Sequence, residues 1–160
     1  MLGLFRKKEE LVFSPCNGKI IPIEKIEDDV FSKKMMGDGI GIIPSDSQIV
    51  SPINGEVVQI FETKHAILLK SKEETLILIH IGLDTVGLDG KPFKVNIECG
   101  SNVSKGQQIM DVDFDMIREA KLDTTVIVIL MDEENKKTII EKAYGLDVSN
   151  DKYILKIKNK

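Results

Sequence analysis

The sequence lacks several features that mark common classes of protein. It contains no tryptophan among its 160 residues, so nothing in it suggests an aromatic stacking platform. Lysine and arginine number 22 against 26 aspartates and glutamates, which gives a formal net charge of -4. Without an excess of basic residues, the chain has no electrostatic footprint for nucleic acid, and we expect no nucleic-acid partner.

Long apolar runs and clustered cysteines are also missing. No run approaches the ~20 apolar residues of a membrane-spanning helix, and the charged start of the chain does not resemble a signal peptide. Cys16 and Cys99 are isolated and form no C-x-x-C motif, which favours two reduced thiols. We therefore expect a cytoplasmic protein.

The composition is that of an ordinary globular domain, with 42% hydrophobic and 30% charged residues. A chain of this length favours one domain with its own core. We expect residues 1–10 to form a flexible N-terminal segment and residues 11–160 to form a single β-domain.

One short motif occurs twice. The letters S-P-x-N-G stand at 14–18 and return at 51–55, each time followed by a β-branched run that predicts a strand. In such a turn proline fixes φ, and we expect glycine to supply the freedom for φ > 0. Two copies are too few for a solenoid and suggest a β-domain built from two related halves.

The remaining patterns are mostly those of strands. Only residues 114–120 look helical, with Asp113 or Asp115 available as the N-cap. Short apolar runs with turn signals every ten or so residues are typical of antiparallel sandwiches and barrels. The predicted fold class is all-β: a single-domain antiparallel β-sandwich or barrel with internal duplication and at most one or two short helices.

Both histidines lie within residues 61–84, in two apolar runs separated by the polar residues 71–74. This pattern predicts a β-hairpin. If the loop is symmetric about the Lys72–Glu73 bond, paired residue numbers sum to 145 and His65 lies directly opposite His80. Their Cβ atoms would then be about 4.5–5.5 Å apart on one face, whereas a one-residue slip would place them on opposite faces. The same face would carry Phe61, Thr63, Ile67, Leu76 and Leu78.

A facing pair of imidazoles supports phosphoryl transfer as one hypothesis. A neutral ring nitrogen can accept a phosphoryl group and pass it on, while the second imidazole stabilises the phosphoryl oxygens. Thr63 could hydrogen-bond a ring nitrogen and set its tautomer. The apolar surroundings would then serve as a docking surface for a partner protein.

Three other hypotheses stay open on the residues alone. His65, His80 and Asp84 would make a plausible zinc set, although no H-x-H or H-E-x-x-H motif supports it. A hydrolase with histidine as general base would lack a G-x-S-x-G nucleophile motif. The fourth hypothesis is a structural pair of histidines with no chemistry.

Four motifs together resemble one known family. They are F-E-T-K-H-A at 61–66, H-I-G-L-D-T-V at 80–86, M-G-D-G-I-G-I at 36–42 and the S-P-x-N-G repeats. In these elements the chain resembles the glucose-type enzyme IIA component of the bacterial phosphoenolpyruvate:sugar phosphotransferase system. The resemblance runs from about Leu11 to the C-terminus, and it implies an antiparallel β-sandwich that acts as a phosphotransferase component.

The resemblance also implies roles for single residues. His80 would be the phosphorylated histidine, and His65 would support the phosphoryl group during transfer. Thr63 would hydrogen-bond a histidine, and Asp84 would lie at the edge of the site. An apolar rim that docks both partners would map to Val30, Phe31, Met36, Phe61 and Leu78.

The partners follow from the same resemblance. The donor would be the histidine-containing phosphocarrier protein, and the acceptor would be the IIB domain of a glucose-type sugar permease. Membrane contact would occur only through that permease. No cofactor is required, although zinc could bind as an accessory ion through His65, His80 and a carboxylate of a partner.

Overall fold

The computed structural model describes residues 8–145 and 147–160 of the chain. Strands dominate this part, and every strand pairing in it is antiparallel. In chain order the strands are β1 (Glu9–Phe13), β2 (Gly18–Pro22), β3 (Gly39–Pro44), β4 (Gln48–Val50), β5 (Gly55–Ile60), β6 (Ala66–Lys70), β7 (Leu76–Ile81), β8 (Phe93–Val95), β9 (Asn102–Val103), β10 (Gln108–Val112), β11 (Val126–Met131), β12 (Lys137–Lys142), β13 (Asp147–Val148) and β14 (Tyr153–Asn159).

Helical structure in the described residues is short. There are two α-helices, α1 (Asp29–Ser32) and α2 (Phe114–Glu119), and two 3-10 turns, η2 (Ile23–Lys25) and η3 (Thr85–Leu88). The helix predicted over 114–120 is confirmed, and Asp113 is its cap because its carboxylate accepts from the N–H of Met116 at 3.1 Å. α1 is a single turn that the sequence patterns did not reveal. No helix in the described ranges is long and apolar enough to span a bilayer.

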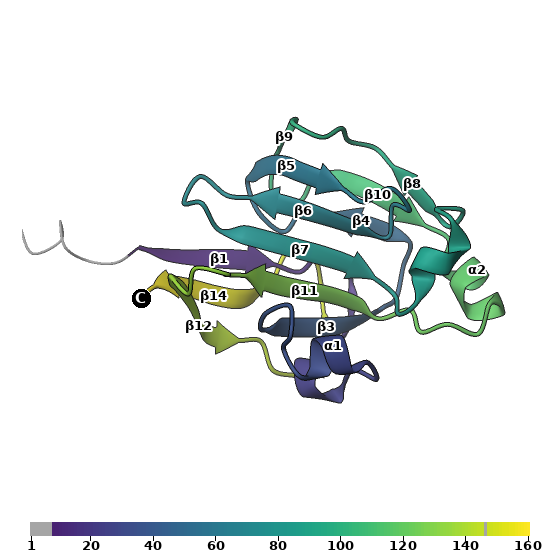
Figure 1. Ribbon diagram of the computed structural model, residues 1–160, viewed down its shortest axis with the longest axis horizontal. Helices are drawn as coiled ribbons and strands as arrows, with labels where there is room; N and C mark the ends of the chain where they lie inside the picture. The colour runs from purple at the N-terminus through teal and green to yellow at the C-terminus, as the bar shows by residue number, and fades with distance from the viewer. Residues whose placement is uncertain (1–7, 146) are drawn as a thin grey trace, which may run out of the picture.

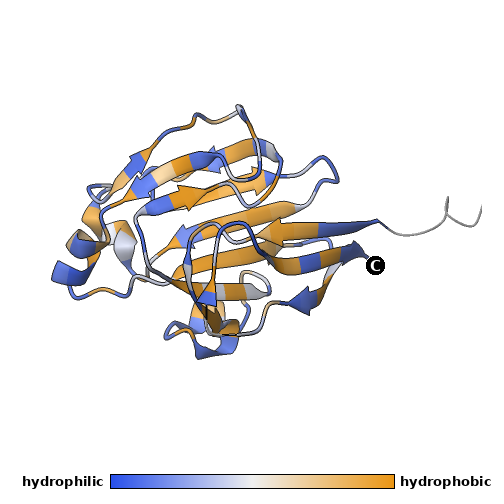
Figure 2. Cartoon of the chain, turned by 180° about the vertical axis from the view of Figure 1, so that it is seen from behind, coloured by the Kyte–Doolittle hydropathy of each residue, from blue (hydrophilic) through white to orange (hydrophobic). Residues whose placement is uncertain are grey.

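The strands form two layers (Figure 1). One layer is an eight-stranded sheet in the order β13-β2-β3-β11-β7-β6-β5-β9, and the other contains the three-stranded sheets β1-β14-β12 and β4-β10-β8. The main core lies between the layers, because one side of each strand is apolar and faces inward. The predicted all-β sandwich is therefore confirmed. Figure 2 shows the apolar residues running along the strands and the polar residues concentrated in the connections.

The two S-P-x-N-G motifs have the same local structure, which supports the predicted duplication. Ser14 and Ser51 are both fully buried, and each hydroxyl donates to the carbonyl two residues later, at 2.6 and 2.7 Å. The motifs also bond to each other reciprocally: the N–H of Phe13 donates to the Pro52 carbonyl, and the N–H of Val50 to the Pro15 carbonyl. Residues that are 37 positions apart thus exchange roles across an approximate two-fold relationship.

The glycines of these motifs act differently from the prediction. Neither Gly18 nor Gly55 has a positive φ. A Cβ at Gly18 would lie 2.0 Å from the Ile43 carbonyl oxygen, and one at Gly55 would lie 2.3 Å from that of Lys70. Glycine is needed here because a neighbouring strand passes too close for any side chain.

The outer face of the large sheet carries a second apolar cluster, and this cluster positions the site. It combines strand residues with residues from the connection between β2 and β3, which covers part of this face. We call this group the outer cluster; its buried members are Ile23, Ile26, Phe31, Ala66, Leu78, Leu83, Ile127 and Ile129. A sheet that is apolar on both faces explains why its central strands read as continuous hydrophobic runs.

The start of the β-domain lies slightly before the predicted boundary. Glu9 and Glu10, which we expected in the flexible segment, are part of β1 and pair with Lys158 and Ile157 of β14. The Glu10 carboxylate is largely buried and accepts from the hydroxyls of Ser71 and Thr75, which explains how a charged residue can belong to the sheet. Lys8 is described and forms an exposed ion pair with Glu73, whereas residues 1–7 of the predicted segment lie outside the described residues.

Candidate functional site

The predicted hairpin exists, but its register differs by one residue from the prediction. β6 and β7 pair Lys70 with Leu76 and Ala66 with His80. The loop contains an odd number of residues because Glu74 adopts the left-handed conformation, with φ 63°. A three-residue loop that ends in a left-handed residue shifts the pairing by one relative to a symmetric two- or four-residue loop. The direct cross-strand pairing of His65 with His80 is therefore wrong.

The two imidazoles nevertheless meet. His65 precedes the first residue of β6 and follows Lys64, which is also left-handed, with φ 60°. The His65 carbonyl still accepts from the N–H of Ile81 at 2.7 Å, which keeps its backbone beside the end of β7. The ring centroids of His65 and His80 lie 5.0 Å apart with an interplanar angle of 80°. The local kink at Lys64 thus compensates for the slip of register.

The slip changes which apolar residues surround the pair. Ala66 of β6 is a buried member of the outer cluster and Leu68 packs against it, whereas Ile67 points into the main core. Ile67 was expected on the histidine face, so that prediction is wrong. Phe61 does lie beside the pair, with its ring centroid 5.6 Å from that of His65.

Thr63 is the hydrogen-bonding partner of His65. Its hydroxyl lies 2.6 Å from Nδ1 of the ring. His65 is only 8% exposed, and burial lowers the pKa of its imidazole. The neutral ring has one protonated and one unprotonated nitrogen, so the hydroxyl at Nδ1 influences which nitrogen carries the proton.

His80 is more exposed to solvent than His65 but is covered from one side. The ring of Phe31, which α1 places over the sheet, lies 4.8 Å from the His80 ring between centroids. Nδ1 of His80 is buried and has no partner in hydrogen-bonding geometry among the described residues. His80 as a whole is partly exposed although its Nδ1 is buried, and Nε2 is not among the buried unpaired atoms, so Nε2 is the ring nitrogen on the accessible side of the ring.

The protonation of His80 is strongly perturbed. Burial, and secondarily the proximity of His65, lower its pKa to about 4. The Gly82 backbone, acting as a hydrogen-bond acceptor, and the Asp28 carboxylate raise the pKa by smaller amounts. Since Nδ1 has no fully formed hydrogen bond, the Gly82 acceptor must lie near the ring without good alignment. His80 is therefore neutral at pH 7.

The sequence analysis did not identify Asp28 as a site residue. Its carboxylate caps α1 by accepting from the N–H of Val30 at 2.8 Å, and this position also brings its charge near His80. The capping role is a recognisable sequence signal only once the one-turn helix is known. Asp28 and His80 are 52 positions apart in the sequence, which explains why no local pattern could connect them.

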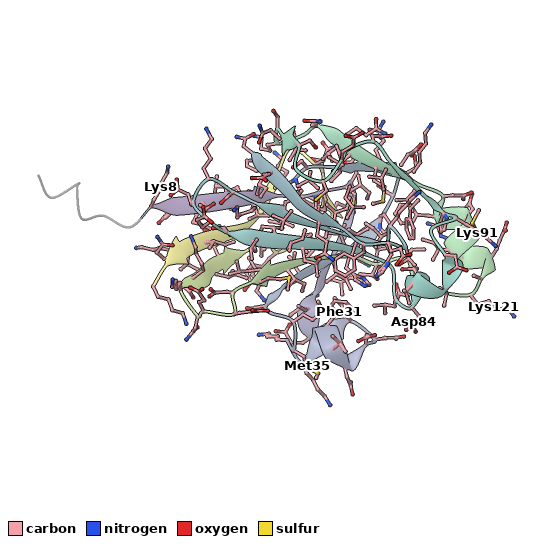
Figure 3. All side chains as sticks on the ribbon, turned by 45° about the horizontal axis from the view of Figure 1, so that its top comes forward. Lys8, Phe31, Met35, Asp84, Lys91 and Lys121 are labelled. Atoms are coloured by element: carbon pink, nitrogen blue, oxygen red, sulfur yellow. The ribbon has the colours of Figure 1, made fainter. Side chains whose placement is uncertain are left out.

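Asp84 lies where the chain leaves the site after β7. It is exposed and left-handed, with φ 60°, and its side chain does not cap η3. In Figure 3, Phe31 and Asp84 lie toward the same side of the sheet. Among the described residues, no group of three histidines, cysteines or acids is placed to hold a metal ion. A zinc ligand set of His65, His80 and Asp84 is therefore not formed.

The two histidines alone provide a partial metal site. Nδ1 of His65 is engaged by Thr63 and Nδ1 of His80 is buried, so the two Nε2 atoms are the available ligands. A catalytic zinc ion requires three protein ligands. The pair fits an accessory ion only if another molecule supplies the remaining ligand.

The five residues expected at a docking rim divide into two groups. Val30 is 40% exposed, and Met36 and Phe61 are partly exposed, so these three can contact a partner. Phe31 and Leu78 are 5% and 1% exposed. Since they support the rim from below as members of the outer cluster, their placement on the contact surface needs correction.

Comparisons with known proteins agree with this fold. Residues 10–136 match the family model described as phosphoenolpyruvate-dependent sugar phosphotransferase system, EIIA 1. The chain is 44% identical over 131 residues to the PTS system glucose-specific EIIA component of Bacillus cereus, covering 81% of this chain and 79% of that protein. It is 38% identical over 135 residues to the component of the same name from Halalkalibacterium halodurans, covering 84% and 78%.

A longer relative and a solved structure extend the comparison. The PTS system glucose-specific EIICBA component of Staphylococcus saprophyticus is 41% identical over 152 residues, which is 95% of this chain but only 22% of that protein. The chain thus spans about a fifth of that relative. The structure of glucose permease IIA from Mycoplasma capricolum superposes with a TM-score of 0.85 at 31% identity, covering 93% of this chain and 96% of the other.

Proposed function

The chain belongs to the EIIA 1 family of the phosphoenolpyruvate-dependent sugar phosphotransferase system, and we propose that it relays a phosphoryl group on His80 during sugar uptake. The donor would be the histidine-containing phosphocarrier protein, and the acceptor would be the IIB domain of a glucose-type permease. Relatives in which one chain carries the EIICBA components support the second assignment. We place this relay in the cytoplasm, with membrane contact only through the permease.

One observation carries the proposal: His80 presents one open ring nitrogen beside a second imidazole, 5.0 Å away between centroids. Nucleophilic attack requires a neutral ring, and a pKa of about 4 keeps His80 neutral at pH 7. For Nε2 to offer its lone pair, the ring proton must sit on Nδ1. The Gly82 acceptor beside the ring favours that tautomer.

The transfer step moves one phosphoryl group between two imidazoles. The Nε2 lone pair of His80 attacks phosphorus and forms a new N–P bond while the N–P bond of the donor breaks. The donor imidazole leaves with the electron pair of the broken bond, and the proton on Nδ1 of His80 stays in place. The reverse geometry, with His80 as leaving group, passes the phosphoryl group to the acceptor. Catalysis then consists mainly of positioning and charge stabilisation.

His65 would supply that stabilisation. If the Thr63 hydroxyl donates to Nδ1, the ring proton of His65 lies on Nε2 and can be donated to a phosphoryl oxygen. Burial lowers the pKa of His65 and so keeps the ring from competing as a second positive charge beside His80. In this proposal the two histidines have different roles because they have different partners at Nδ1.

Charged groups around the pair would assist in two ways. Asp28 favours positive charge on His80, which develops on the imidazole as the N–P bond forms. Asp84 is exposed at the edge of the site and available to a cation of a partner. The proposed docking surface combines the two carboxylates with the apolar rim residues Val30, Met36 and Phe61. Such a surface would fit a partner that presents apolar and basic side chains.

The proposal is tested by phosphorylation in a reconstituted chain. The protein is incubated with labelled phosphoenolpyruvate, enzyme I and the phosphocarrier protein, and an acid-labile, base-stable phosphate is measured. We expect one phosphate per wild-type chain and none on His80→Gln. Labelling of His80→Gln at the wild-type rate would overturn the assignment. The variant His65→Gln serves as the matched control, because it removes an imidazole but retains the proposed acceptor.

Zinc binding is the alternative that this experiment leaves aside. We propose zinc only as an accessory ion shared with a partner carboxylate, since the described residues provide two ligands. Metal analysis of the purified protein distinguishes the cases. A tightly held stoichiometric zinc ion in the protein alone would favour a zinc module instead.

A further inference from the structure

The segment that follows His80 has an unusual backbone. β7 ends at Ile81, and the chain then turns away through Gly82, with φ 75°, and Asp84, with φ 60°. Left-handed conformations are sparsely populated for residues other than glycine, so contacts elsewhere must hold this turn in place. The turn contains the Gly82 acceptor beside the His80 ring.

Thr85 closes this turn from inside. Its side chain is fully buried, and its hydroxyl donates to the Ile81 carbonyl at 2.5 Å. Its methyl group packs against Gly82 so closely that a Cβ at Gly82 would lie 2.5 Å from Thr85 Cγ2. One side chain therefore contacts both residues that directly follow His80.

A second set of contacts holds the same turn from residues 123–125, the segment that leads into β11. The N–H of Gly82 donates to the Thr125 carbonyl at 2.8 Å, and the N–H of Leu83 donates to the Asp123 carbonyl at 3.1 Å. The Asp123 carboxylate accepts from the N–H and the hydroxyl of Thr125, at 2.7 and 2.6 Å, which fixes this edge of the sheet. The turn is clamped on one side by Thr85 and on the other by residues 123–125.

Besides filling space in the interior, the Thr85 side chain restrains the backbone that follows His80. The Gly82 carbonyl can move only by rotating the peptide between Gly82 and Leu83, and the Leu83 N–H at the other end of that peptide is already bonded. The Thr85 methyl group blocks the remaining space beside the Gly82 α-carbon. The position of the Gly82 carbonyl near His80 thus depends on Thr85 remaining where it is.

We propose that Thr85 is a positioning residue for His80: by holding the Ile81–Gly82 turn it aims the Gly82 carbonyl at the imidazole and keeps the ring proton on Nδ1, leaving Nε2 free to accept the phosphoryl group. This inference rests on the proposed function. Nδ1 of His80 is buried and has no partner in hydrogen-bonding geometry among the described residues, so the nearby Gly82 carbonyl is the group whose position decides whether its proton finds an acceptor.

Two variants separate the hydroxyl of Thr85 from its methyl group. Thr85→Val keeps the shape but places a methyl group against the Ile81 carbonyl, which must then move. Thr85→Ser keeps the hydroxyl and loses only the methyl contact. The tautomer of His80 is read at neutral pH from long-range proton–nitrogen correlations in the unphosphorylated protein, and the phosphorylation rate is measured with the donor chain.

For Thr85→Val we expect a mixture of His80 tautomers and a rate lower by about tenfold, the scale associated with one displaced hydrogen-bonding group. Thr85→Ser should retain the wild-type tautomer and most of the rate. The tautomer of His65 is an internal control, since its Nδ1 contacts the Thr63 hydroxyl and neither variant changes that contact.

A remote variant controls for general loss of stability. Thr75 is also a buried threonine with a bonded hydroxyl, but it directly precedes β7, at the end of the strand opposite to His80, and bonds to Glu10. Thr75→Val should lower the melting temperature without changing the His80 tautomer or the rate. A Thr85→Val protein with the wild-type tautomer and rate overturns the inference, as does a Thr75→Val protein with the same tautomer change. Failure of the wild type to accept phosphate would instead overturn the proposed function, and the tautomer measurement does not depend on that result.

Discussion

His65 and His80 face each other at 5.0 Å between ring centroids although they are not cross-strand partners, because His80 pairs with Ala66. The contact is produced by the left-handed backbone of Lys64, which turns His65 out of the strand pattern. It leaves the rings at 80° to each other, with different groups at their Nδ1 atoms. This asymmetry underlies the different roles proposed for the two histidines.

Removal of the assisting imidazole should separate the two halves of the relay. We expect His65→Gln to be phosphorylated on His80 but to pass the phosphoryl group to the IIB domain about 100-fold more slowly, the scale of effect for one lost donor to developing charge. Single-turnover transfer from the isolated phosphoprotein measures this directly. Onward transfer at the wild-type rate would remove His65 from the mechanism.

The depressed pKa of His80 predicts a pH dependence of stability. In the unfolded chain this histidine binds a proton near pH 6.5, whereas in the folded protein it does so only near pH 4. Above pH 6.5 the group is neutral in both states and does not oppose folding, and as the pH falls toward 4 its protonation in the unfolded chain progressively destabilises the folded state. Between pH 7 and 5 we expect a loss of about 2 kcal/mol from this one group.

Denaturant unfolding of wild type and His80→Gln at several pH values tests this expectation. Carboxylates also titrate in the lower part of the range, so the relevant quantity is the difference between the two proteins. The unfolding free energy of the wild type should fall relative to that of His80→Gln as the pH decreases from 7 to 5. A difference that is independent of pH would mean that His80 titrates normally in the folded protein.

A charge at the proposed rim should weaken docking without unfolding the protein. Val30 is 40% exposed and lies in the first turn of α1, where an acidic residue is favourable for the helix. We expect Val30→Asp to lower the rate of phosphorylation at subsaturating donor by about tenfold or more, since one disrupted interface anchor typically costs over 1 kcal/mol.

The matched control for Val30→Asp is Leu11→Asp. Leu11 is also 40% exposed but lies on β1 in the other layer, where it pairs with Lys156 across the strands. The rate of Leu11→Asp should equal that of wild type. Equal slowing in both variants would show that added negative charge, and not docking at the rim, is responsible.

The loop that sets the hairpin register should respond to glycine in a position-dependent way. Glu74 has a φ of 63°, a conformation that costs a side chain about 1–2 kcal/mol. Glu74→Gly should therefore stabilise the protein by about 0.5–1 kcal/mol after the entropy cost of glycine is subtracted. Lys72→Gly, in the same loop but without a positive φ, should destabilise it by a similar amount. Thermal and denaturant unfolding measure both. The reverse result, with Glu74→Gly destabilising and Lys72→Gly stabilising the protein, would contradict the observed register.

Several elements of the site could be predicted from sequence because they depend on neighbouring residues. The alternation of apolar residues on either side of 71–74 predicts the β6–β7 hairpin, and the polar Asp113 before an apolar run predicts the cap of α2. The proximity of Thr63 to His65 follows from their spacing of two residues. The repeated S-P-x-N-G motif predicts two halves with the same local structure, and the paired bonds of Ser14 and Ser51 agree with this.

The register and the choice of buried faces could not be predicted in this way. Glu74 and Lys64 adopt left-handed conformations without being glycine or asparagine, so no residue type announces them. The prediction placed Ile67 beside the histidines for this reason, although it packs in the main core. Likewise, Gly18 and Gly55 are required by close strands that come from elsewhere in the chain.

Local sequence patterns are enough to place two histidines close together in an antiparallel β-domain, with a threonine two residues before the first. How these rings face each other, and which nitrogen of His80 is open, depends on packing between distant segments. The same packing lets Phe31 and Asp28, about fifty residues away, set the surroundings of His80. The physical reason is that strand pairing follows local alternation, whereas desolvation and charge proximity sum over every segment that folds against the ring.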